Sequence, residues 1–101
     1  MNTQTAAAAL KTAFKKVGHT NVVATDNEVA LFHYNTQIIT VVDGCVTVNN
    51  GGFMTVTTKK FINRALDAIG ANAGISQRNF AWYITANGIE STFERSFSFA
   101  A

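Results

Sequence analysis

Two dipeptides constrain the fold more than any other feature of the chain. Asp43-Gly44 and Asn87-Gly88 each stand between two runs in which apolar and polar residues alternate. Both central positions of a type I′ turn need a positive φ, which Asp, Asn and Gly tolerate, so each dipeptide predicts a two-residue hairpin. Strands joined by two residues run antiparallel, because a parallel pair needs a long crossover. The chain is therefore expected to build an antiparallel sheet.

Two other segments place their apolar residues at helical spacing. The first is rich in alanine, the strongest helix former, and offers a threonine cap at its start and a glycine at its end. The second also follows a threonine and ends at a glycine. The predicted helices are residues 3–17, with Thr3 or Thr5 as N-cap and Gly18 at the end, and residues 58–69, with Thr57 as N-cap and Gly70 at the end.

The remaining runs predict strands, because their residues alternate with a period of two. The expected strands are residues 22–24, 28–34, 37–42, 45–49, 80–86 and 89–99, with a short extra strand at 53–56 as an option. The order α-β-β-β-β-α-β-β predicts an α+β fold, an antiparallel sheet of about 5–7 strands with two helices packed on one face. No linker or repeat divides residues 1–101, so a single domain is expected.

The composition excludes several classes of protein. With 48% hydrophobic residues and a net charge of +2, the chain is too apolar and too weakly charged to be disordered. The lone Cys45 rules out a disulfide framework and favours a reducing compartment. No apolar run is long enough to cross a bilayer. We therefore expect a cytoplasmic protein with no membrane partner.

The sequence offers little for catalysis or metal binding. A general base near neutral pH is most often histidine, and the chain has only His19 and His33. His33 shares parity with Val29 and Leu31, which predicts a side chain in or beside the core. Zinc ligands in pairs are absent, because Cys45 has no second cysteine. The sequence thus predicts a non-enzyme with no catalytic residue, no cofactor and no metal.

One glycine-rich segment before the second helix is compatible with ligand binding. Gly51 and Gly52 permit a close backbone approach, and a helix N-terminus favours anions. The predicted anion contact comprises Gly51, Gly52, Thr57 and Thr58, next to the positive charges of Lys59, Lys60 and Arg64. The alternative interpretation is purely structural, with the glycines forming a turn and Thr57 capping the helix.

The same segment resembles a motif of small phage-encoded proteins of unknown function. The motif runs Gly51-Gly52-Phe53-x-Thr55-x-Thr57-Thr58 and continues with Lys60, Asn63 and Ala65-Leu66. A later part is similar to Gln77-Arg78 followed by Phe80-Ala-Trp82-Tyr83-Ile84, so that the resemblance spans residues 28–85. The chain departs from it at Phe53, where tryptophan is expected. The resemblance implies a phage or mobile-element source and an action on a host molecule, and it assigns no site residue.

These observations favour a non-enzymatic inhibitor or modulator of a host protein complex, an anti-defence or anti-CRISPR-like protein in the cytoplasm of an infected bacterium. The surplus of aromatic residues supports this hypothesis, since aromatic side chains anchor interfaces. The expected partner contacts are Lys59, Lys60, Arg64, Arg78, Trp82, Phe97 and Phe99.

Three alternatives remain open at this point. The chain could bind single-stranded nucleic acid, with aromatic residues stacking on bases and basic residues holding phosphates. It could sequester a nucleotide or another small ligand in a pocket at the two glycines. A second copy of the chain is a further candidate partner, because an open sheet has two edges to protect. For nucleic acid, the expected residues are Tyr34, Phe53, Trp82 and Tyr83 with Lys59, Lys60 and Arg64.

Overall fold

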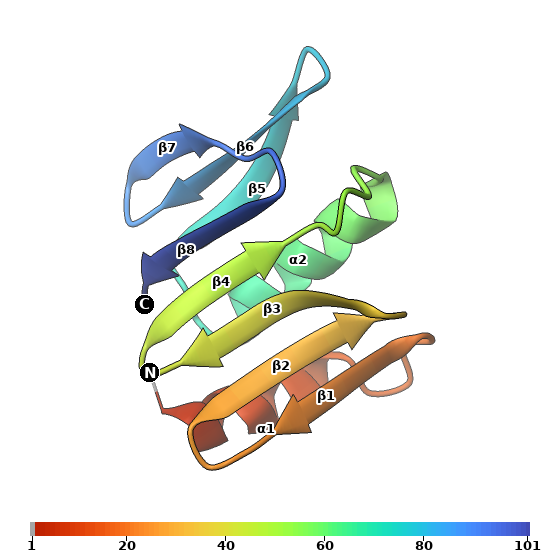
Figure 1. Cartoon of the computed structure of the whole chain (residues 1–101), viewed down its shortest axis with the longest axis vertical. Helices are drawn as coiled ribbons and strands as arrows, with labels where there is room; N and C mark the ends of the chain where they lie inside the picture. Colours follow the sequence, from red (N-terminus) through yellow and green to blue (C-terminus); the bar gives the residue numbers. More distant parts are fainter. Residues whose placement is uncertain (1) are drawn as a thin grey trace.

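Two antiparallel sheets and two helices make up the structure, a computed structural model that describes residues 2–101 (Figure 1). The larger sheet has the strand order β1-β2-β3-β4-β8 and the smaller one β5-β6-β7. Both helices cover the same face of the larger sheet, which confirms the predicted α+β class. The elements are α1 (Thr3–Ala13), β1 (Thr20–Ala24), β2 (Glu28–His33), β3 (Thr36–Val42), β4 (Cys45–Asn49), α2 (Val56–Ala68), β5 (Ala73–Arg78), β6 (Ala81–Ala86), β7 (Ile89–Thr92) and β8 (Ser96–Ala100).

Both predicted hairpins are confirmed. Asp43 and Gly44 have φ values of 49° and 76°, and Asn87 and Gly88 have 52° and 83°. These positive values are those of a type I′ turn, whose twist matches that of the strands it joins. The first turn fixes the pairing of β3 with β4, and the second fixes that of β6 with β7.

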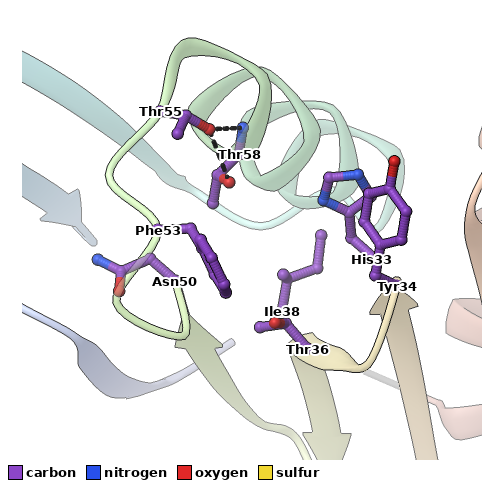
Figure 2. Close-up of a pocket in the computed structure, with 8 residues that line it drawn as sticks. All are labelled: His33, Tyr34, Thr36, Ile38, Asn50, Phe53, Thr55 and Thr58. Atoms are coloured by element: carbon purple, nitrogen blue, oxygen red, sulfur yellow. Dashed lines mark hydrogen bonds between the residues drawn. The ribbon is translucent and has the colours of Figure 1, made fainter.

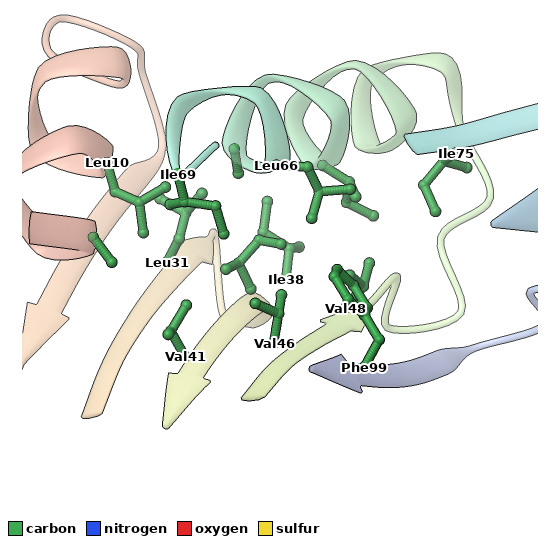
Figure 3. Packing of buried hydrophobic residues seen from close by; sticks show 14 of the residues in the cluster. Leu10, Leu31, Ile38, Val41, Val46, Val48, Leu66, Ile69, Ile75 and Phe99 are labelled. Carbon is green, nitrogen blue, oxygen red and sulfur yellow. The ribbon is translucent and has the colours of Figure 1, made fainter. Parts of the chain in front are cut away.

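An irregularity in β3 adds one apolar side chain to the core. Leu31 pairs with Ile39 and Phe32 with Gln37, so Ile38 is an extra residue without a partner in β2. Such a bulge bends the strand and changes the direction of a side chain. Ile38 and Ile39 are both buried, and the core fills the space between the larger sheet and α2 (Figure 3).

The ends of both helices differ from the sequence-based expectation. The side chain of Asn2 caps α1, in place of Thr3 or Thr5, and the helix ends at Ala13. Lys16 takes the left-handed conformation (φ 67°) that we expected at Gly18, because the chain must turn back at once to enter β1. Thr55 caps α2 in place of Thr57, so this helix starts two residues earlier than predicted. Gly70 ends the α2 segment at φ 72°, as predicted.

The expected long strand 89–99 is divided between the two sheets. Its first part is β7 and its last part is β8, which lies at the edge of the larger sheet beside β4. Phe93, 1% exposed, lies between them and packs against Trp82. Ile89, Phe93, Phe97 and Phe99 keep one parity across the break, which led to the prediction of one strand. Arg95, the charged residue that interrupts this parity, lies in the break itself. The optional strand at 53–56 is a loop that leads into α2.

The strand β5 is the element that the sequence prediction missed. It has one buried apolar residue, Ile75, and therefore no clear alternation. Its outer edge lies along α2, where the side-chain amide of Asn63 accepts from the backbone N–H of Ile75 at 2.7 Å and donates to its carbonyl at 3.0 Å. Asn63 thus satisfies backbone groups that an edge strand leaves open.

The fully buried Asn50 connects the end of β4 to the crossover between the sheets. Its side-chain amide donates to the carbonyl of Glu94, and its backbone N–H donates to the carbonyl of Arg95. Its side-chain oxygen accepts from the N–H of Gly52 at 2.7 Å, and its carbonyl accepts from the N–H of Phe53. One residue therefore holds both the β7–β8 crossover and the loop before α2.

Replacing Asn50 should be costly. The variant Asn50→Ala removes the side-chain hydrogen bonds to the Glu94 carbonyl and from the Gly52 N–H, each worth about 0.5–1.5 kcal/mol, and it empties part of a fully buried site, which adds a cavity cost. We expect the free energy of unfolding to fall by about 2–4 kcal/mol, measured by urea denaturation. The matched variant Asn21→Ala removes an exposed amide on β1 and should stay within about 0.5 kcal/mol of the wild type. Equal losses in the two variants would contradict the role assigned to Asn50.

Candidate functional site

A pocket of about 280 Å³ opens at the N-terminal end of α2 (Figure 2). It lies between the turn that joins β2 to β3 and the loop that joins β4 to α2. Aromatic and aliphatic groups form its walls, and three threonines and an asparagine supply polar atoms. The lining residues are His33, Tyr34, Thr36, Ile38, Asn50, Phe53, Thr55 and Thr58.

Stacked aromatic rings form one wall of the pocket. Tyr34 stacks on His19 with a ring-centroid distance of 4.4 Å, and His33 lies 4.8 Å from Tyr34. His33 also meets the ring of Phe61 edge-on, which places it beside the core as predicted. Burial, and secondarily the nearby His19, lower the pKa of His33 below its ordinary value. The lowered pKa favours the neutral imidazole of His33 at pH 7.

The polar atoms around the pocket are bonded mainly to each other. The Thr55 hydroxyl donates to Thr58 Oγ1 and accepts from the Thr58 backbone N–H. The Gly51 N–H donates to the side chain of Asn49, as the Gly52 N–H does to Asn50. The glycine N–H groups are thus engaged within the chain. Of the predicted anion contact, only Thr58 lines this pocket, and Thr57 lies with Lys60 in a separate, more open hollow.

The predicted basic contacts lie at several places. Lys59 donates to the side chain of Gln77 on β5. Arg64 donates from Nε to the carbonyl of Ala13 at 2.8 Å, so it caps the end of α1. Arg78 forms a two-point ion pair with Glu90, which raises the pKa of Arg78 and lowers that of Glu90. Lys60 and Arg64 line the same hollow on α2, whereas Lys59 faces β5 and Arg78 lies on the smaller sheet.

The predicted aromatic contacts lie mostly in the core. Trp82 is 3% exposed and Phe99 is 9% exposed, whereas Phe97 is half-buried beside Phe99. Tyr83 is half-buried, with the guanidinium of Arg78 4.1 Å from its ring centroid. Trp82 and Phe99 therefore hold the sheets together and offer little surface to a partner.

A different set of apolar side chains is exposed at the end of the molecule that holds the pocket. We call this set the aromatic end: Tyr34, Phe53, Met54, Val56 and Phe80. The strand β5 runs antiparallel to α2, since Asn63 bonds to Ile75 and Lys59 to Gln77. The β5–β6 turn that carries Phe80 therefore lies toward the side of the molecule where α2 begins, and Figure 1 shows it projecting beyond the helix at the top of the view.

Sequence reasoning missed Phe80 because nothing marks its turn. Asn79 and Phe80 have φ values of 48° and 68°, as in a type I′ turn, but such a turn favours glycine at the second position. Tyr34 also has a positive φ, 55°. Tyr34 and Phe80, the two most exposed aromatic residues at this end, thus occupy turn positions that usually hold residues such as glycine or asparagine. Only the pairing of the strands reveals these turns.

No catalytic or metal-binding arrangement is found in residues 2–101. His33 pairs with the first residue of β3 and Cys45 with the last, which places them at opposite ends of a strand about 20 Å long. No group of three or more histidine, cysteine, aspartate or glutamate side chains is placed to hold a metal ion among these residues. In the same residues, no helix has the length and apolarity needed to cross a membrane.

The loop beside the pocket requires glycine at position 51. Gly51 has a φ of 63°, and a Cβ there would lie 2.7 Å from Thr36 Cγ2. Gly88 also has a positive φ, 83°, but a Cβ there would meet nothing within 4 Å. We expect Gly51→Ala to cost about 1–3 kcal/mol more than Gly88→Ala, because the clash adds to a strain that the two variants share. Thermal denaturation measures the difference, and equal losses would contradict the contact with Thr36.

Comparison with known proteins agrees with a phage source. No curated protein matches the chain, and neither does any solved structure. A family model described as "Kyanoviridae Gp96 protein" matches residues 1–100. The match covers nearly the whole chain, so the resemblance to small phage proteins is supported for the molecule and not only for its glycine-rich segment. The chain belongs to the Kyanoviridae Gp96 protein family, a family of phage proteins.

Proposed function

We propose that this phage protein is a non-catalytic binding protein that inhibits or modulates a host protein complex inside the infected bacterium. The observation that carries the proposal is the aromatic end. Tyr34 and Phe53 are 63% and 60% exposed and line an open pocket, whereas Phe80, 94% exposed, lies at the tip of the β5–β6 hairpin. Exposed aromatic residues around a concavity are typical of protein interfaces.

The backbone at this end supports the same proposal. A residue with a side chain loses on the order of 1–2 kcal/mol in the left-handed conformation that Tyr34 and Phe80 adopt. Exposing a phenyl ring to water adds a further cost. Strain of this kind is found most often at functional sites. A surface feature that is unfavourable for the isolated chain is explained if a partner covers it.

The first test compares two variants in capture from a lysate of the phage's host. Tyr34→Ser/Phe53→Ser removes two rings from the aromatic end, whereas Val23→Ser/Ile89→Ser removes two exposed apolar side chains elsewhere. The wild type and the second variant should retain a host complex in stoichiometric amounts. The amount of host complex retained by the first variant should fall at least tenfold, because aromatic side chains are the usual hot spots of interfaces, often worth about 2 kcal/mol or more. Equal retention by both variants would contradict the assignment of the face.

The inhibitory role needs its own readout. Wild-type protein produced in the host should lower the activity of the captured complex, and the Tyr34→Ser/Phe53→Ser variant should not. Capture of the complex without any change in its activity would support binding to the host complex but would refute the proposed inhibition.

Single-stranded nucleic acid is the second candidate partner, favoured by the distribution of charge. The helices and the turn after α1 hold six of the eight basic residues and only one acid, Asp67, a net charge of +5. The rest of the chain holds two bases and five acids, a net charge of −3. Tyr34 and Phe53 lie exposed beside this basic layer, where bases could stack while lysines hold phosphates.

Salt dependence tests this candidate. Binding of a fluorescent oligo(dT) to the wild type should weaken as salt rises, with a log–log slope near −0.7 per phosphate contacted. Lys59→Glu/Lys60→Glu should abolish binding, whereas Lys11→Glu/Lys15→Glu, an equal change of charge outside the predicted contact residues, should weaken it less. The absence of binding at about 50 mM salt with micromolar protein would rule the candidate out.

A further inference from the structure

The tip of the β5–β6 hairpin carries the most exposed large apolar side chain of the described residues. Phe80 is 94% exposed and occurs in none of the ring contacts that the other aromatic residues make. It sits on a two-residue turn, so its ring stands clear of both strands. Phe80 has the form of a projection that a cavity could receive.

The pocket at the start of α2 has the form of a matching cavity. A closed apolar cavity of about 150 Å³ is large enough to bind benzene. The pocket measures about 280 Å³, and its walls include Phe53, Tyr34 and Ile38. The lowered pKa of His33 favours its neutral form there, which does not oppose the entry of a phenyl ring. The pocket therefore has the size and the lining to accept one phenylalanine side chain and part of its turn.

We propose that two copies of this chain form a dimer in which Phe80 of each copy enters the pocket of the other. The hairpin tip and the pocket both lie toward the side of the molecule where α2 begins, because β5 runs antiparallel to α2 (Figure 1). A two-fold axis between such features produces two identical contacts and closes the assembly at two copies.

The exposed area at this end agrees with a dimer. Aromatic side chains bury about 150–250 Å² each. The exposed parts of Tyr34, Phe53, Met54, Val56 and Phe80 therefore amount to on the order of 600 Å². Two copies would bury roughly 1,200 Å², the lower limit of a standard stable interface. The dimer should accordingly be weak, and it would cover the face that we assign to the host complex until that partner displaces one copy.

A complementation experiment with purified protein tests the dimer. Phe80→Ala removes the projection and keeps the pocket, whereas Phe53→Asp places a charge at the pocket and keeps the projection. Sedimentation velocity from about 10 μM to 1 mM should show that the wild type dimerises. The dimerisation affinity of each variant should be at least tenfold weaker, as expected when a buried aromatic anchor or its pocket is lost. An equimolar mixture of the two variants should associate more tightly than either alone, because it restores one of the two contacts. Ile89→Ala and Ile89→Asp, at a site 69% exposed on the other hairpin of the smaller sheet, should dimerise like the wild type.

Three results would overturn the proposal. The first is a wild type that remains monomeric at 1 mM. The second is a dimer that Phe80→Ala leaves unchanged, which would point to pairing of sheet edges. The third is a mixture of variants that associates no better than its components. None of these results involves a host component, so the dimer can fail while the proposed host binding stands, and the capture experiment can fail while the dimer stands.

Discussion

The hydrogen bonds of Asn50 are the constraint on which most of the architecture depends. A buried amide costs free energy unless its donors and acceptor are paired, and here the pairing joins two distant parts of the chain, residues 50–53 and residues 94–95. Through Glu94 and Arg95 it fixes the point where the chain leaves the smaller sheet and enters the larger one. Through Gly52 it fixes the loop that forms one wall of the pocket. The pocket is therefore a consequence of how the two sheets are joined, and its shape is as stable as that junction.

The aromatic end depends on a second alignment, that of β5 with α2. Asn63 binds the backbone of Ile75 from the helix side, which sets how far the β5–β6 hairpin extends. Moving this register by two residues would shift Phe80 by about 7 Å along the helix, relative to the pocket. A single asparagine on a helix thus positions an exposed ring at the tip of a hairpin, and the helix cap at Thr55 positions the pocket.

The sequence predicted those features that local preference determines. Asp-Gly and Asn-Gly dipeptides specify their own turns, and alternation specified β2, β3 and β4 with errors of one residue. Sequence-based prediction failed where tertiary contacts determine the local structure. The strand β5 is held by Asn63 and not by an apolar pattern of its own, and the break between β7 and β8 is imposed by Asn50. The aromatic content was read as a sign of an interface, but periodicity could not tell that Trp82 is core while Phe80 is exposed.

The segregation of charge limits which partner can hold the aromatic end. The helices and the turn after α1 carry +5 and the rest of the chain −3, so two copies that meet near α2 bring like charges together, and the apolar contact must outweigh their repulsion. A partner with an acidic surface meets no such repulsion and is also steered toward this layer. At 0.1 M salt the Debye length is about 10 Å, so both the repulsion and the attraction are largely screened beyond that distance. Added salt therefore favours the dimer and disfavours an acidic partner. The same face therefore favours dimerisation at high ionic strength and binding of an acidic partner at low ionic strength.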